Sequence, residues 1–321
     1  MAQAAQGASD EGSAEDAAGL ARTGQDLLTQ GRLVRAANLA ARACALDPLD
    51  PEALCLAADV ARAEGDLAGA AEAYALWRDS DPADANAAYA AALFAGETPP
   101  PEPAGCTPAA FVVEENLLSG VQQEMIGAYL LANLGEMEAA SVVQSGESQE
   151  DATSRSAHVL YDPEPVEAWF SPFVAAYLPW ALPRLGLAPF DVSQVELQLT
   201  ASYHGDFYHA HHDITLGEAD SVAGRKVSFV YYYHLTPAAF AGGALRLYDH
   251  YPGEGTHTRE RYTTVLPLAN RLVLFRSEAL HEVMPVVAPG GQAEAGRFTL
   301  NGWLHGAGAG GVGVDDRLPS V

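Results

Sequence analysis

Residues 195–214 read VELQLTASYHGDFYHAHHDI, and this stretch indicates the architecture of the C-terminal part of the chain. From Val195 to Ala201, apolar residues at odd positions alternate with polar ones, which is typical of a strand with one buried face. The strand leads directly into a cluster of histidines and one aspartate. Because alternate residues of an extended chain project from the same face, His211 and Asp213 can reach one metal ion while His212 points away.

Further runs of β-branched and aromatic residues follow, separated by turns that contain glycine and proline. They predict strands at residues 226–235, 243–249, 270–276 and 297–305. Several short strands with such turns favour a β-sandwich or barrel of the jelly-roll type. Residues 112–135 and 164–186 are predicted as helices, and the polar residues 144–156 are predicted as a loop.

Two ligands do not complete a metal site, and His281, just past the end of a predicted strand, is the candidate third. Two histidines and one carboxylate occupy one face of an octahedral ion, which suits non-haem Fe(II) with open positions. A structural zinc site normally closes its shell with four ligands, usually including cysteine. Since His209 has the same parity as His211 and Asp213, a cupin-type H-x-H-x-D set remains an alternative.

These residues resemble the Fe(II)- and 2-oxoglutarate-dependent dioxygenases, particularly the prolyl 4-hydroxylase-like branch, over about residues 110–305. The resemblance implies a double-stranded β-helix, or jelly roll, with flanking helices, and thus an α+β fold class for the whole chain. It is carried by five segments in the order of the family, namely YHGDFYHAHHD (203–213), RKVSFVYYYHL (225–235), FAGGALRLYD (240–249), NRLVLFRSEALHEVMPV (270–286) and GRFTLNGWLH (296–305).

The resemblance also assigns roles to individual residues. The metal and catalytic triad falls on His211, Asp213 and His281, and the residue that anchors 2-oxoglutarate falls on Arg297. A guanidinium suits that task, because it can pair with a carboxylate through two hydrogen bonds. The co-substrate pocket is expected to include also Thr299, Tyr203, Tyr208 and Tyr232, although the sequence does not decide which of residues 231–233 faces the site.

The function implied by the resemblance is hydroxylation of an unactivated C–H bond, with 2-oxoglutarate converted to succinate and CO₂. We expect the acceptor to be a peptidyl or protein side chain, of the proline type or aspartate. Ascorbate is implied as a reductant that rescues oxidised iron. Two alternatives stay open: a hydroxylase of a free amino acid or small natural product, and a binding adaptor with a weakly active oxygenase fold.

The N-terminal part contains an internal repeat, in which residues 31–48 align without a gap with residues 65–82. Gly31 recurs as Gly65 and Pro48 as Pro82, so the period is that of the tetratricopeptide family, which this segment resembles. Glycine suits the turn between the two helices of a repeat. Two repeats do not bury a continuous core alone, so the array should pack on the remaining domain or on a second chain. Packing on a second chain would make the protein a homodimer, which is one expectation. The repeats are also expected to bind a peptide.

The resulting domain organisation has five parts. We predict a disordered tail at residues 1–16, tetratricopeptide-like repeats at 17–96, a proline-rich linker at 97–106, the dioxygenase jelly roll at 107–308 and a flexible tail at 309–321. The linker is predicted from "ETPPPEPAG", a stiff polyproline-type spacer.

The net charge of the chain and its N-terminal sequence limit the partners and the location that we expect. The chain has 17 Lys plus Arg against 42 Asp plus Glu, and a formal net charge of −25. Such a surface repels phosphate backbones and anionic lipids, which argues against nucleic acid and membrane as partners. No stretch has the pattern of a secretory signal or a membrane span, so we expect a cytoplasmic protein.

Overall fold

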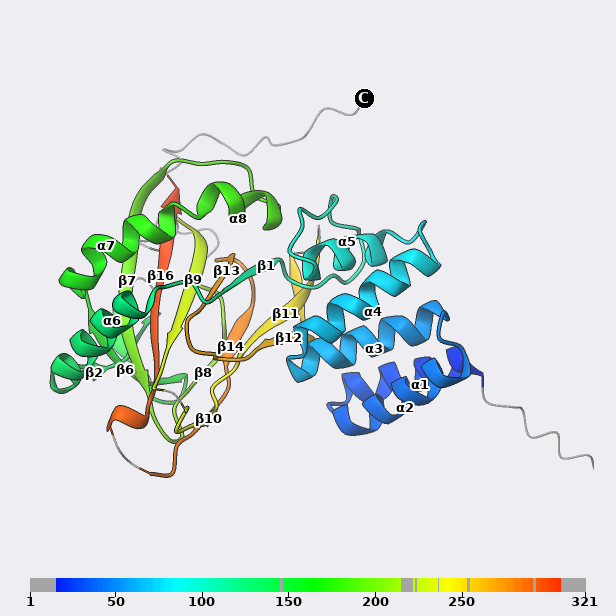
Figure 1. Ribbon diagram of the computed structural model, residues 1–321, viewed down its shortest axis with the longest axis horizontal. Coiled ribbons are helices and arrows are strands. Elements are labelled where there is room, and N and C mark those ends of the chain that lie inside the picture. Colours follow the sequence, from blue (N-terminus) through cyan, green and yellow to red (C-terminus); the bar gives the residue numbers. More distant parts are fainter. Residues whose placement is uncertain are drawn as a thin grey trace, which may run out of the picture.

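The computed structural model describes residues 16–144, 147–214, 222, 224–235, 237–252, 255–290 and 293–306. The chain begins with a set of helices and continues into antiparallel sheets, which lie side by side in Figure 1. Apart from Asp16, the predicted tails at residues 1–16 and 309–321 lie outside the described residues.

The N-terminal helices are α1 (Ala17–Thr29), α2 (Leu33–Leu46), α3 (Pro51–Glu64), α4 (Leu67–Ser80) and α5 (Ala85–Phe94). Asp50 and Asp66 cap α3 and α4, since each carboxylate accepts a hydrogen bond from a backbone N–H of the first turn. Gly31 and Gly65 occupy the turns within the two hairpins at φ of 71° and 86°, a conformation that favours glycine. The predicted helical segment is therefore present, while its membership of the tetratricopeptide family stays a prediction.

The C-terminal part contains two main antiparallel sheets that face each other. The larger has the strand order β1-β13-β9-β16-β7-β6-β2 and the smaller the order β12-β11-β14-β8-β5. Two two-stranded sheets, the hairpin β3-β4 and the pair β10-β15, complete the strands of the described residues. The predicted α+β fold with a jelly roll is thus confirmed. The strands are β1 (Phe111–Glu115), β2 (Glu138–Ala139), β3 (Ser141–Gln144), β4 (Glu147–Glu150), β5 (Arg155–Ser156), β6 (His158–Tyr161), β7 (Val192–Ser202), β8 (Phe207–His211), β9 (Arg225–Tyr233), β10 (Ala241–Gly242), β11 (Leu245–Tyr251), β12 (Thr256–Val265), β13 (Arg271–Arg276), β14 (His281–Val283), β15 (Val286–Val287) and β16 (Arg297–Gly306).

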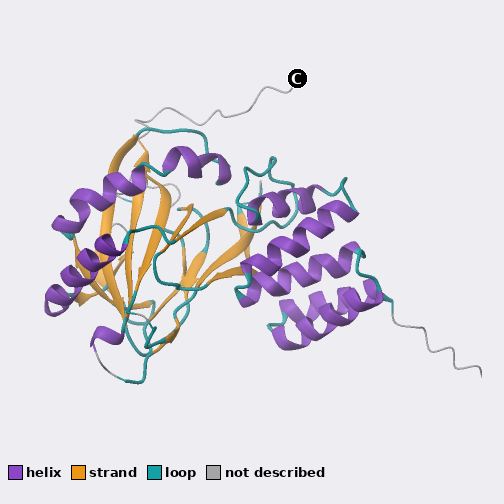
Figure 2. Ribbon diagram, viewed as in Figure 1, coloured by secondary structure: helices purple, strands orange, loops and turns teal. Residues whose placement is uncertain are grey.

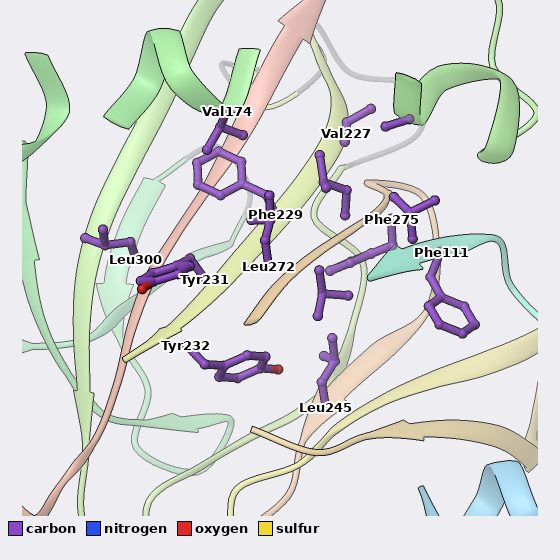
Figure 3. Packing of buried hydrophobic residues seen from close by; sticks show 14 of the residues in the cluster. Phe111, Val174, Val227, Phe229, Tyr231, Tyr232, Leu245, Leu272, Phe275 and Leu300 are labelled. Atoms are coloured by element: carbon purple, nitrogen blue, oxygen red, sulfur yellow. The ribbon is translucent and has the colours of Figure 1, made fainter. Parts of the chain in front are cut away.

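Three helices cover the outer face of the larger sheet: α6 (Gly120–Asn133), α7 (Glu164–Ala175) and α8 (Leu178–Arg184). Phe170 of α7 is fully buried, and its ring lies 5.5 Å from that of Tyr231 and 6.2 Å from that of Phe229. Figure 3 shows that Tyr231 and Tyr232 point to opposite sides of β9. The alternation of a strand therefore places Tyr231 against the helices and Tyr232 between the two sheets.

The N-terminal helices pack against the β11–β12 hairpin of the smaller sheet (Figure 2). The contact includes a buried ionic network, in which both terminal nitrogens of Arg62 lie 2.6 Å from the carboxylate oxygens of Asp249. Asp59 accepts from Arg62 Nε at 2.9 Å and pairs also with Arg261 of β12. Thr264 Oγ1 donates to the backbone carbonyl of Ala63 at 2.7 Å. The array is thus docked on the remaining domain of its own chain.

The linker that follows α5 is held by side-chain contacts rather than standing free. Glu102 accepts from the hydroxyl of Tyr89 at 3.0 Å and pairs with Arg276 Nη1 at 3.5 Å. Burial raises the pKa of Glu102, but His250 and Arg276 outweigh it and hold this pKa at about 2. The linker therefore joins α5 to the end of β13 through an ionised carboxylate.

The prediction of a helix over residues 112–135 is wrong in its first part. Phe111–Glu115 forms strand β1, which pairs antiparallel with β13. The helix begins only at Gly120, where Ser119 and Gln122 form a capping box. The apolar residues of β1 are explained by the sheet that buries them rather than by a helical period.

The prediction of a loop over residues 144–156 is also incorrect in part. Ser141–Gln144 and Glu147–Glu150 pair as a hairpin, and Arg155–Ser156 pairs with β8. Backbone hydrogen bonds pair these short strands, and such pairing does not need an apolar pattern.

Candidate active site

The structure brings His211, Asp213 and His281 together in a cavity between the two sheets. His211 ends β8, His281 begins β14, and the two are directly paired across these neighbouring strands. Asp213 follows two residues after β8, and its backbone N–H donates to the carbonyl of Ser277 at 3.1 Å. One ligand atom from each of the three side chains lies within 4.8 Å of the others. The spacing fits a single ion between them.

Backbone carbonyls fix the orientation of both imidazoles. His211 Nδ1 lies 2.7 Å from the carbonyl oxygen of His209, and His281 Nδ1 lies 2.9 Å from that of Ala279. A carbonyl oxygen only accepts hydrogen bonds, so each Nδ1 carries the proton and each Nε2 presents a lone pair. Both Nε2 atoms point at Asp213, each 3.5 Å from one of its oxygens.

This arrangement fits a bound cation on chemical grounds. Two imidazole lone pairs and a carboxylate face one another without a proton between them, which is unfavourable unless positive charge lies among them. Burial and the neighbouring His211 together lower the pKa of His281 to about 4, so His281 is neutral at physiological pH. Burial raises the pKa of Asp213, but the neighbouring histidines and Ser228 outweigh it and hold this pKa well below its ordinary value. The donor set suits Fe(II) with part of its coordination sphere open.

A β-bulge in β8 explains why His209 lies apart from the metal ligands. His281 pairs with His211 but Val283 pairs with Tyr208, so β8 has one residue more than β14 between these pairs. The extra residue breaks the alternation on which the H-x-H-x-D alternative depended. His209 is exposed and packs on Phe207, and it is absent from the converging group of described residues.

The same bulge brings Tyr208 onto the face of His211. Their rings are stacked with centroids 3.5 Å apart, and the guanidinium of Arg155 lies 4.9 Å from the centroid of the Tyr208 ring. Tyr208 lines the cavity, as expected for a residue of the co-substrate pocket.

Arg297, the first residue of β16, lines the same cavity as the three metal-ligand candidates. It is 3% exposed, and its Nε donates to the carbonyl of Gly243 at 2.7 Å. That bond fixes the planar side chain. Among the described residues the terminal nitrogens have no further well-aligned hydrogen bond, although the guanidinium lies close enough to the Tyr232 hydroxyl to oppose the rise that burial causes in its pKa. Burial lowers the pKa of Arg297, although an arginine starts so high that it stays charged.

Tyr232 lies beside this guanidinium, whose carbon is 5.1 Å from the centroid of the tyrosine ring. Tyr232 is fully buried, and within the described part of the chain its hydroxyl has no hydrogen-bond partner. Buried hydroxyls normally have a partner, so one next to a fixed cation fits a bound carboxylate. Tyr233 turns toward Gly127 of α6, so Tyr232 is the member of its triplet that faces the interior.

The two remaining predicted residues differ in their position. Thr299 is buried and lines the cavity. Tyr203 is not among the lining residues, and its ring packs on His158 and Phe298 with centroids 5.5 Å and 6.4 Å away. A side chain in that place is more suited to support the wall of the cavity than to contact a co-substrate.

Two side chains that contact or support Asp213 were not predicted from the sequence. Ser228 Oγ donates to Asp213 Oδ2 at 2.6 Å, and Arg225 Nη1 donates to the Asp213 backbone carbonyl at 3.2 Å. Arg225 also pairs with Glu196 at 2.6 Å and lies 3.6 Å from the ring centroid of Trp303. Ser228 has the same parity as Tyr232 in β9, and this inward alternation is the signal that could have identified it.

Comparisons with known proteins agree with this geometry. Residues 197–305 match the family described as the 2OG-Fe(II) oxygenase superfamily. An uncharacterized PKHD-type hydroxylase of Synechocystis sp. is 40% identical over 129 residues, which are 40% of this chain and 42% of the relative. The chain therefore matches about two fifths of the length of that curated relative.

Among solved structures, a prolyl-4-hydroxylase of Pseudomonas putida is 22% identical, with a TM-score of 0.44 over 62% of this chain and 94% of that chain. A prolyl hydroxylase from Trichoplax adhaerens, solved with a peptide fragment of a hypoxia inducible factor, is 19% identical over 61% of this chain and 83% of that chain. Its TM-score is also 0.44. Within the described residues, no helix is long and apolar enough to cross a membrane.

Proposed function

Because the chain carries a 2OG-Fe(II) oxygenase domain, we propose that this protein is an Fe(II)- and 2-oxoglutarate-dependent dioxygenase that hydroxylates an unactivated C–H bond. We further propose a peptidyl or protein side chain, of the proline type or aspartate, as the acceptor. Ascorbate dependence, a homodimer and a cytoplasmic location stay predictions from the sequence.

One observation carries the proposal. The convergent group His211, Asp213 and His281 and the buried cation Arg297 line one cavity, although they come from three separate segments of the chain. A metal site with open positions and a fixed guanidinium in the same cavity suit a ligand with a chelating end and a carboxylate end, which describes 2-oxoglutarate. A binding protein without turnover has no physical need for both.

Different residues of the site would bind the metal, bind the co-substrate and orient the metal ligands. His211, His281 and Asp213 would hold Fe(II), which with 2-oxoglutarate and O₂ would supply the chemistry of C–H hydroxylation. One oxygen atom of O₂ would enter the acceptor as the hydroxyl group and the other would enter succinate, with release of CO₂. Arg297 would pair with the distal carboxylate, and Tyr232 would donate its unpartnered hydroxyl to it. Ser228 keeps Asp213 in place, and the burial of the site strengthens these charged contacts by excluding water.

The acceptor class rests on two supports. The 40% identical relative is named a hydroxylase, which favours hydroxylation as the outcome. The cavity has a volume of 230 Å³, below the range of roughly 300–1,000 Å³ typical of pockets that enclose a drug-sized ligand. A single side chain presented by a larger molecule fits this limit better than a bulky natural product, while a free amino acid remains the alternative.

A spectroscopic titration tests the proposal without knowledge of the acceptor. Under anaerobic conditions, Fe(II) and 2-oxoglutarate added together should produce a visible charge-transfer band that neither produces alone. His211→Ala and Asp213→Ala should abolish the band. Arg297→Ala should form it only at much higher 2-oxoglutarate concentrations, and the control His209→Ala should form it as the wild type does. A band that survives in the two ligand variants refutes the assignment of the metal site.

A coupled assay then separates the proposed enzyme from the adaptor alternative. In air, the wild-type protein should release succinate from 2-oxoglutarate, and Arg297→Ala should lose this release at low 2-oxoglutarate. A protein that forms the band but releases no succinate with any peptide or amino acid acceptor fits the adaptor instead.

A further inference from the structure

We propose that a second cavity beside the metal centre binds an apolar or aromatic side chain of a peptide acceptor, a few residues from the hydroxylated one. The imidazoles of His212, His250 and His257 line this cavity, whose volume is 660 Å³. The inference rests on the proposed function, because it concerns the same reaction, and it names a determinant of acceptor choice.

The small size of the catalytic cavity requires that a peptide continue outside it. Within 230 Å³, the co-substrate takes the space between the metal ligands and Arg297. One acceptor side chain fits in what remains, so the rest of a peptide must lie on the adjoining surface. An extended peptide advances roughly 3.3–3.6 Å per residue, so a neighbouring cavity is reached within a few residues.

The second cavity adjoins the first at the segment that carries Asp213. His212 and Ile214, on either side of Asp213, line both cavities. The remaining wall comes from the linker before β1, the end of β11, the start of β12 and the turn before His281. A peptide that leaves the metal centre past Asp213 therefore meets this cavity first.

The imidazoles form an aromatic wall. The His212 and His257 rings have centroids 4.8 Å apart at 60°, and those of His250 and His257 lie 6.0 Å apart at 35°. His212 is fixed by a contact of 2.7 Å between its Nδ1 and the carbonyl of Glu278. Ring faces and edges of this kind favour aromatic or apolar partners. The apolar part of the wall comes from Ala109, Ala110, Ile214, Pro252 and Ala279.

The charged groups of the wall are already paired with one another. Glu102 lies 3.2 Å from His250 Nε2 and 3.5 Å from Arg276 Nη1, and the same Arg276 nitrogen lies 3.6 Å from Glu278. The one arginine of the wall is thus shared by two carboxylates, so an anionic side chain finds no unpaired cation among the described lining residues. In the described part of the chain the converging metal-ligand group is that of His211, Asp213 and His281, so a second metal site is not the better interpretation.

His257 offers the sharpest test, because it lines the cavity from β12, the edge strand of its sheet, so that a larger or smaller side chain there should change the space in the cavity. The full-length protein is loaded with Mn(II) and N-oxalylglycine to prevent turnover. It is then used to select bound peptides from two random libraries, one with a fixed central proline and one with a fixed central aspartate. We expect the wild type to enrich Leu, Phe, Tyr or Trp at one fixed offset from the central residue.

Two variants should change this preference in opposite directions. His257→Ala widens the cavity and should favour Trp and Phe, whereas His257→Trp narrows it and should favour Ala and Val, each by roughly tenfold relative to the wild type. His234→Ala, which changes a half-buried histidine outside this cavity, is the matched control and should select like the wild type. Each variant is first checked for the unchanged charge-transfer band with Fe(II) and 2-oxoglutarate.

The outcomes separate this inference from the proposed function. Selection of the same flanking residue by the wild type and both His257 variants overturns the inference, as does enrichment of Lys, Arg, Asp or Glu at that offset. If neither library is retained while the charge-transfer band is present, the peptide acceptor itself is wrong and the inference falls with it.

Discussion

The buried ionic network between the helices and the smaller sheet makes a quantitative prediction about Arg62→Met. The side chains of Arg62 and Asp249 are each 1% exposed, and two contacts of 2.6 Å join them. Asp59 and Arg261 complete the network, so it holds two carboxylates and two guanidinium groups. Methionine keeps much of the aliphatic volume and removes one positive charge, which leaves two buried carboxylates with one cation.

The expected loss follows from the burial of the pair. Removal of one partner of a buried ion pair costs about 3–5 kcal/mol, because the other charge stays desolvated. Arg261 Nε lies 3.6 Å from Asp249 and offsets only part of this loss. The matched control is Arg22→Met, since the Arg22–Glu52 pair has side chains 63% and 50% exposed and should contribute less than about 1 kcal/mol.

Urea unfolding of the full-length chain, followed by circular dichroism, measures both variants. Arg62→Met should lower the midpoint strongly and Arg22→Met hardly at all, with similar slopes. A further Asp249→Asn substitution restores one carboxylate per cation and should recover most of the loss. If Arg62→Met costs no more than the control, the helices are not held to the sheet in the way described.

Three further predictions concern the site and the network. Ser228→Ala removes the hydrogen bond to Asp213 and should weaken Fe(II) binding by roughly 10–100-fold in an equilibrium titration, while an unchanged affinity would remove Ser228 from the site. Tyr232→Phe should raise the dissociation constant of 2-oxoglutarate with Fe(II) bound, and an unaltered constant would show that its hydroxyl contacts no co-substrate. Burial raises the pKa of Asp59, but Arg261 and Arg62 outweigh it and lower this pKa from 3.8 to about 2. Because this pKa is lower in the folded than in the unfolded state, the ionised Asp59 stabilises the folded protein above pH 3.8, and this stabilisation is lost as the pH falls through about 2. Asp59→Asn should therefore make the free energy of unfolding depend less steeply on pH in this range. An equally steep profile in the variant would contradict the assignment.

Local patterns determined much of the fold. The alternation from Val195 to Ala201 gave a strand, and the paired glycines at 31 and 65 gave helical hairpins, because side-chain periodicity and left-handed turns are properties of a few neighbouring residues. The spacing of His211 and Asp213 predicted one face of a strand end for the same reason. The strand at Phe111–Glu115 escaped this reasoning, since an apolar run of that length fits a helix or a buried strand equally well.

Tertiary structure decided what depends on the pairing of distant segments. Parity alone could not separate His209 from the metal ligands, because the bulge in β8 exists only through its pairing with β14. The choice of Tyr232 as the inward tyrosine depended on α6 and α7, which bury its neighbours. Arg62 and Asp249 are 187 residues apart in the sequence, and they form an ion pair only because the helices pack on the β11–β12 hairpin. Long-range contacts of this kind follow from the packing of whole elements, to which no short pattern in the sequence corresponds.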